Sequence, residues 1–155
     1  MRASFILFAL SLSSALHAQT KEPRSVAAEA LHMAVSLTER EMRECTKAHP
    51  QQSQRFMESA AKSRAKLETA LEGLRSKRAQ DLDLAVPEVL VVGREMMEAL
   101  MATDTSRLKL EICNRTADEI ARATDQEASD LMNQLVSTLL SGIAAHQQGM
   151  ARALR

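Results

Sequence analysis

Apolar residues recur every three or four positions along most of this chain, and charged residues fill the positions between them. An α-helix turns once in about 3.6 residues, so this spacing gathers the apolar side chains on one helical face. It predicts helices over about 23–47, 50–78 and 87–102, and helical sequence again from about residue 106 onward. We therefore expect an all-α fold, an antiparallel helical bundle of four to five helices.

The first two predicted helices each carry one inward stripe. The first stripe consists of Leu31, Val35, Thr38, Met42 and Cys45, and the second of Phe56, Ala60, Ser63, Leu67, Ala70 and Leu74. Residues 79–86 are predicted to be the longest connection of the bundle. Asp81 and Asp83 favour turns there, and Pro87 restricts Val86 to an extended conformation.

The third predicted helix is apolar over much of its circumference. Val89, Val92, Met96 and Leu100 line one side, with Leu90, Met97 and Met101 beside them. Such a helix is central in the bundle, a packed insertion, or covered by a partner. Methionine side chains adapt to varied partners, so we predict a partner surface at Met96, Met97 and Met101. Burial of these methionines inside the monomer is the alternative.

The last third of the chain also reads as helical. Leu110, Cys113, Ala117 and Ile120 share one face, and Thr124 with Glu127 forms a capping-box pattern. The capping box either starts a fifth helix or lies within one long, kinked helix. The apolar stripe that follows it consists of Leu131, Leu135, Leu139, Ile143, His146 and Met150.

Cys45 and Cys113 are the two cysteines of the chain, and both fall on predicted inward stripes. They are too far apart for a CxxC redox motif, and two thiols alone do not complete a structural zinc site. We predict that they form one disulfide that staples the bundle. Closing a loop of this length would stabilise the fold by at most about 4 kcal/mol in the chain-entropy model.

The first eighteen residues predict a compartment. Arg2 supplies a positive charge, residues 5–16 form an apolar run, and Ala18 is a small residue suited to cleavage. This is the pattern of a secretory signal peptide (1–18), and the run is shorter than the about 20 residues that span a bilayer. We expect residues 19–155 to form one exported, periplasmic domain with a flexible start at 19–22 and no membrane anchor. If the chain does not come from a Gram-negative bacterium, we expect it to be secreted instead of periplasmic.

The composition and the missing motifs argue against several classes of function. Twenty basic residues balance twenty acidic ones, which is not the basic footprint of a nucleic-acid-binding protein. Trp and Tyr are absent, so the aromatic platforms of sugar-binding and single-strand-binding sites are missing. No common catalytic motif is present, and nearly every Asp and Glu falls on a predicted outer face. We expect neither an enzyme nor a cofactor.

Two function classes remain. The first is a non-catalytic exported protein that acts by protein–protein interaction, such as an inhibitor, an immunity factor or a chaperone-like factor; a homodimer is one option. The second is copper handling. His146 and Met150 are four residues apart on one helix face, and thioether ligands favour Cu(I). The block 146–151 resembles the His/Met-bearing helices of small periplasmic copper-associated bundles, which implies metal ligation by this pair.

Overall fold

The computed structural model describes residues 23–100 and 109–154, and within them it is all-helical apart from one isolated bridge between Ser25 and Ala85. The α-helices are α1 (Val26–Ala48), α2 (Ser53–Leu82), α3 (Glu88–Leu100), α4 (Leu110–Arg122) and α5 (Asp125–Ala153); a 3₁₀ turn, Pro50–Gln52, precedes α2. The all-α prediction is confirmed, and α4 and α5 are separate helices. The predicted signal peptide, the predicted flexible start at 19–22 and Met101 lie outside the described residues.

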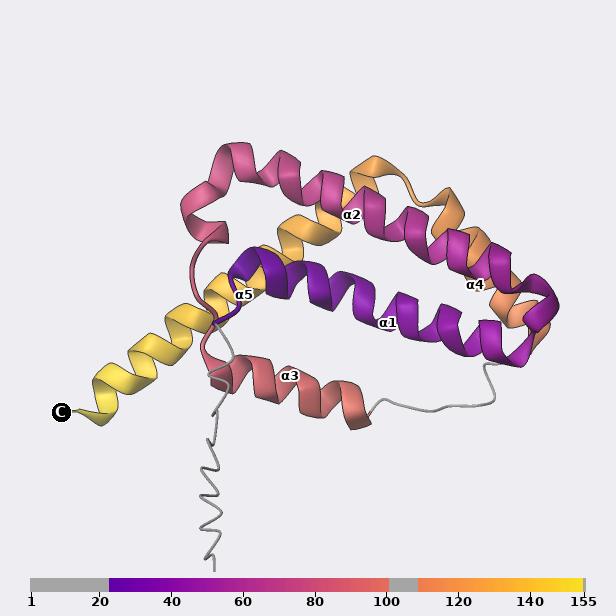
Figure 1. Cartoon of the computed structure of the whole chain (residues 1–155). Coiled ribbons are helices and arrows are strands. Elements are labelled where there is room, and N and C mark those ends of the chain that lie inside the picture. The colour runs from indigo at the N-terminus through magenta and orange to yellow at the C-terminus, as the bar shows by residue number, and fades with distance from the viewer. Residues whose placement is uncertain (1–22, 101–108, 155) are drawn as a thin grey trace, which may run out of the picture.

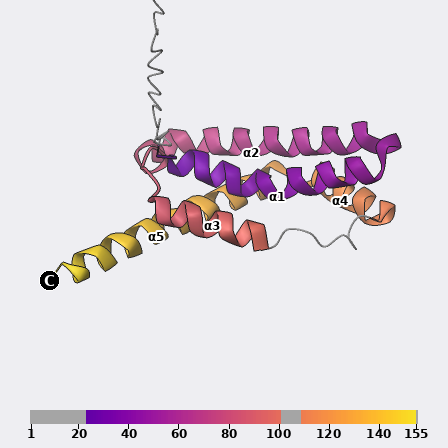
Figure 2. The same ribbon diagram turned by 60° about the horizontal axis from the view of Figure 1, so that its bottom comes forward.

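Helices α1 and α2 run antiparallel and side by side (Figure 1). Helix α3 lies along α1 on the side away from α2, as both views show (Figures 1 and 2). Helix α4 packs against α2 near the α1–α2 turn. Helix α5 then crosses α1 and α2, and its C-terminal end projects beyond the other helices (Figures 1 and 2).

The N-terminal end of α1 is tied to the connection between α2 and α3. The Ser25 hydroxyl caps α1 by accepting a hydrogen bond from the Ala28 N–H at 3.2 Å. The Val26 N–H donates to the Leu84 carbonyl, and the Val86 N–H donates to the Arg24 carbonyl, both at 2.8 Å. These two bonds fix where α3 begins relative to α1.

The connection predicted at residues 79–86 is shorter in the structure, because α2 ends later than expected. Helix α2 continues to Leu82, with a kink at Arg78, whose φ and ψ are −139° and 33°. The helix was expected to end at this residue, but one more turn follows the kink because Leu82 is fully buried in the core. The turn-favouring residues therefore interrupt the helix later than predicted, and the connection lies between Asp83 and Pro87.

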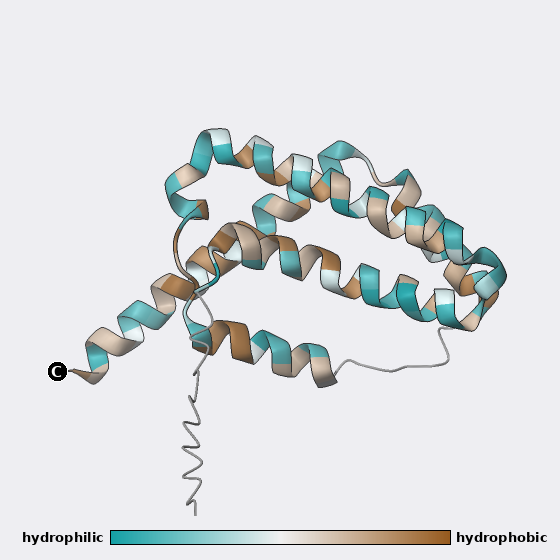
Figure 3. Cartoon of the chain, in the orientation of Figure 1, coloured by the Kyte–Doolittle hydropathy of each residue, from teal (hydrophilic) through white to brown (hydrophobic). Residues whose placement is uncertain are grey.

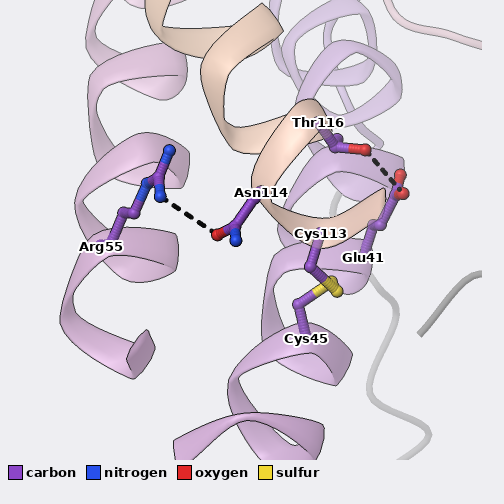
Figure 4. Close-up of a disulfide and its surroundings, with 6 residues drawn as sticks. All are labelled: Glu41, Cys45, Arg55, Cys113, Asn114 and Thr116. Atoms are coloured by element: carbon purple, nitrogen blue, oxygen red, sulfur yellow. Dashed lines mark hydrogen bonds between the residues drawn. A yellow bond between two sulfur atoms is a disulfide. The ribbon is translucent and has the colours of Figure 1, made fainter. Parts of the chain in front are cut away.

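Two buried clusters form the core. The larger one joins α1, α2 and α5 with the start of α3, and Val26, Met132 and Val136 are among its fully buried members. The smaller one surrounds the predicted disulfide, which is present between Cys45 and Cys113 with a Cα–Cα distance of 5.8 Å (Figure 4). Both cysteines are fully buried. The disulfide therefore joins α1 to α4 inside an apolar cluster.

The start of α5 is partly as predicted. The capping box is confirmed: the Thr124 N–H donates to Glu127 Oε2 at 2.6 Å, and the Glu127 N–H donates to the Thr124 hydroxyl at 3.2 Å. The expected stripe is wrong in its first turns, because Met132 is fully buried while Leu131 is 40% exposed. Both residues are apolar, so periodicity alone did not choose between them.

Candidate interaction surface

Helix α3 lies with its polar side toward the rest of the protein. The inward side carries Arg94, whose side chain is only 11% exposed, and Glu98, at 21%. The opposite side carries Val89, Val92 and Met96, which are 58%, 45% and 63% exposed. We call these three residues the outer stripe of α3. From Arg94 onward, this is the reverse of the usual orientation of an amphipathic helix, in which the apolar face packs inward.

The polar side of α3 docks on a buried carboxylate of α1. Glu29 is 1% exposed, and its Oε2 lies 3.2 Å from Arg24 Nη1. Its Oε1 accepts a hydrogen bond from Arg94 Nε. A buried carboxylate is costly unless it is paired, so the two guanidinium groups are what make this burial tolerable.

Glu98 extends the same contact by one helical turn. Its Oε1 lies 2.6 Å from Arg94 Nη1 and accepts a hydrogen bond from the Ser36 hydroxyl at 3.2 Å. Arg40 donates to the Glu98 backbone carbonyl at 3.1 Å. Burial alone would raise the pKa of Glu98, but Arg94, Ser36 and His32 outweigh it and lower that pKa below its usual value. We call Arg24, Glu29, Arg94 and Glu98 the α1–α3 ion cluster.

The beginning of α3 is its most hydrophobic part (Figure 3), and the apolar contacts that support the helix lie there. Val91 is buried in the larger core cluster, and Leu90 packs against the same cluster. A methyl group added to Gly142 of α5 would meet Leu90 Cδ1 at 3.3 Å, closer than ordinary contact. The glycine therefore lets the start of α3 approach α5 closely, while the ion cluster holds the rest of α3.

A second apolar stripe is exposed on α5. Ile143 is 6% exposed, but Met150 and Leu154, which continue its stripe, are 54% and 84% exposed. The change occurs because α5 extends past the ends of the other helices (Figures 1 and 2). We call residues 144–154 the α5 overhang.

The predicted metal pair lies on this overhang. His146 is half-buried and Met150 is exposed, and both project from the same helix. Among the described residues, no group of three or more His, Cys, Asp or Glu side chains is placed to hold a metal ion. Ligation by His146 and Met150 stays a prediction from the sequence.

The structure describes two of the three predicted partner residues. Met96 and Met97 are 63% and 55% exposed, so the alternative that both are buried in the monomer is wrong. Met101 lies outside the described residues. The side of α3 that the sequence marked as apolar is also placed: Val89 and Val92 face away from the core, whereas Val91 faces it.

The ion cluster was not predicted from the sequence. Nearly every carboxylate was expected on an outer face, yet Glu29 is buried. One signal was available: Arg94 and Glu98 are four residues apart on the side of α3 opposite its apolar stripe. What the sequence lacked was any mark that Glu29, on a distant helix, completes their pairing.

Other surface features offer less definite sites. A hollow of about 690 Å³ lies along α4 and is lined by residues of that one helix, including Glu111, Arg115 and Arg122. No helix in 23–100 or 109–154 is long and apolar enough to cross a membrane. Comparisons with protein families, with curated proteins and with solved structures found no match to this chain. We therefore infer the function from the surface of the protein itself.

Proposed function

We propose that this protein is exported and non-catalytic, and that it acts by binding another protein chain through the outer stripe of α3. The observation that carries the proposal is the orientation of α3, which presents Val89, Val92 and Met96 to solvent while Arg94 and Glu98 face inward. Full burial of one such side chain contributes about 1.5–3 kcal/mol, so covering three half-exposed ones gives on the order of 3 kcal/mol before the cost of association.

The ion cluster explains why α3 does not simply turn its apolar side inward. Rotation by half a turn would bury the outer stripe but would separate Arg94 from Glu29. The Glu29 carboxylate would then stay buried with only Arg24 beside it, which is strongly unfavourable. The buried carboxylate thus fixes the rotation of α3 and keeps the apolar stripe available to a partner. An inhibitor, an immunity factor and a chaperone-like factor would each use such a surface.

Export is part of the proposal. The pattern of residues 1–18 supports it, and the Cys45–Cys113 disulfide fits an oxidising compartment such as the periplasm. Mass spectrometry of the exported protein should find an N-terminus within a few residues of Gln19. An intact Met1 in protein recovered from that compartment would contradict export.

Site-specific photo-crosslinking tests the interaction. A photoreactive amino acid replaces Met96 in one variant and Met57 in another. Met57 is a matched control, because it is a methionine that is 52% exposed but lies on α2. Both variants are irradiated in the exported fraction of the source cells, after circular dichroism has shown unchanged helical content.

We expect a defined crosslinked product from position 96 that is missing or much weaker from position 57. The added substitution Val92→Asp should abolish this product, because a charge in the stripe opposes apolar contact. Absence of any product at position 96, either with another protein or with a second copy, would refute the proposed function.

A further inference from the structure

We propose that the partner of the outer stripe is a second copy of this chain, and that the two copies exchange their overhangs. The α5 overhang of each copy lies on the outer stripe of α3 in the other. This inference depends on the proposed function, since it names the occupant of the same surface. The resulting dimer is two-fold symmetric and closed, with two identical contacts.

The two surfaces match in size and pattern. The overhang, residues 144–154, is about 16 Å long and the thirteen residues of α3 span about 20 Å, at about 1.5 Å per residue. Met150 and Leu154 are four residues apart, as are Val92 and Met96. Each surface thus carries apolar side chains at helical spacing, over about one turn from Met150 to Leu154 and about two turns from Val89 to Met96, and each can pack against a helix.

The overhang is directed away from the α3 of its own copy. Gly142 meets Leu90 at the beginning of α3, and from there α5 continues outward while α3 runs back along α1 (Figure 1). To reach its own outer stripe, α5 would have to break and reverse direction. A second copy can supply the same overhang with α5 intact.

The charges of the two helices are complementary. The overhang carries Arg152 and no acidic residue, and the exposed start of α3 carries Glu88, whereas Glu98 is turned inward and paired with Arg94. One basic and one acidic exposed side chain favour this pairing over α3 against α3 or overhang against overhang.

Interface size also favours exchange. Stable interfaces bury about 800 Å² on each partner, which three half-exposed side chains do not supply. In the exchange, each copy contributes both its outer stripe and its overhang. Exposed apolar side chains on both elements, including Met97, Met150 and Leu154, then become part of one interface.

Sedimentation equilibrium of the purified mature protein tests the exchange, with variants in each half of the contact. Met96→Asp alters the outer stripe, Met150→Lys alters the overhang, and Met57→Asp is the control on α2. All three side chains are more than half exposed, so the fold should be retained. We expect a dimer for the wild type and for Met57→Asp, and at least about tenfold weaker dimerisation for each of the other two variants.

Mixing the two interface variants is the decisive step. A mixed dimer contains one unaltered contact, and in its second contact the two introduced charges have opposite signs. We therefore expect the mixture to dimerise at least about tenfold more tightly than either variant alone, which is about 1.4 kcal/mol. Pairing of like elements would give no such rescue.

Three results would overturn the exchange. The first is that the wild type stays monomeric up to about millimolar concentration, where binding would contribute only about 4 kcal/mol. The second is that Met150→Lys leaves the dimer unchanged. The third is that mixing the two interface variants does not restore dimerisation. In each case a product from position 96 with a different protein would leave the proposed function standing. Failure of that function is recognised separately, by the absence of any product there.

Discussion

Replacement of Arg94 by Met should loosen α3 more than any surface substitution. Arg94 is the residue that pairs with both Glu29 and Glu98, and its side chain is 11% exposed. Methionine keeps the unbranched stem of the side chain but removes the guanidinium group and its charge. The variant therefore isolates the electrostatic part of the contact between α1 and α3.

The size of the effect follows from the burial of Glu29. Breaking a fully buried ion pair by removing one partner costs about 3–5 kcal/mol. Here Arg24 remains 3.2 Å from the Glu29 carboxylate, and the helix can open to let water in, so we expect a loss of about 2 kcal/mol. The double variant Glu29→Met with Arg94→Met should cost less than the sum of the single changes, by at least about 1 kcal/mol, because no unpaired charge remains.

Two measurements check this prediction. Urea unfolding followed by circular dichroism gives the free energy of unfolding, and hydrogen exchange reports α3 separately from α1 and α2. The control is Arg115→Met on α4: its side chain is 68% exposed and lies 3.9 Å from Glu119, so the change should cost at most about 0.5 kcal/mol. If Arg94→Met costs no more than this control, or if the two cluster substitutions are additive, the ion cluster does not hold α3 as described.

Three further predictions concern the disulfide, acid and copper. Replacing Cys45 and Cys113 together by Ala should lower the free energy of unfolding by up to about 4 kcal/mol; an unchanged urea midpoint would contradict a structural role. The pKa of Glu98 is lowered on folding, so its stabilising contribution is present above its unfolded pKa of about 4.3 and is lost as the pH falls through its folded pKa. Glu98→Gln should therefore destabilise the protein at pH 7 and have little effect near pH 2, and the opposite trend would refute the pairing. Titration with Cu(I) should show no tight stoichiometric binding; tight binding that is lost in both His146→Ala and Met150→Ala would favour copper handling instead.

The sequence predicts well what is local in the chain. Periodicity locates the helices, and the capping box at Thr124 needs only residues three positions apart. The Cys45–Cys113 pairing is long-range, but it was predictable because two inward cysteines leave one combination. These signals are strong because each depends on few residues or on a single choice.

The orientation of α3 was beyond sequence reasoning for a physical reason. It depends on one pair, Glu29 and Arg94, which are 65 residues apart, and nothing in either segment marks the other as its partner. Apolar periodicity therefore left the orientation of α3 open, and the buried carboxylate draws Arg94 inward while Val89 and Val92 face away. The overhang was missed similarly, since the apolar stripe of α5 does not show where its neighbouring helices end.

Methionine oxidation tests the exposed outer stripe most directly. The purified protein is treated at low concentration with a limiting amount of hydrogen peroxide, and peptide mass spectrometry gives the oxidation rate of each methionine. Met96 should oxidise about as fast as Met57, whereas the fully buried Met42 and Met132 should resist. As the protein concentration rises, Met96 and Met150 should become protected while Met57 does not. Met96 that resists oxidation as strongly as Met132 in dilute, monomeric protein would contradict the outward orientation of α3 and the surface proposed on it.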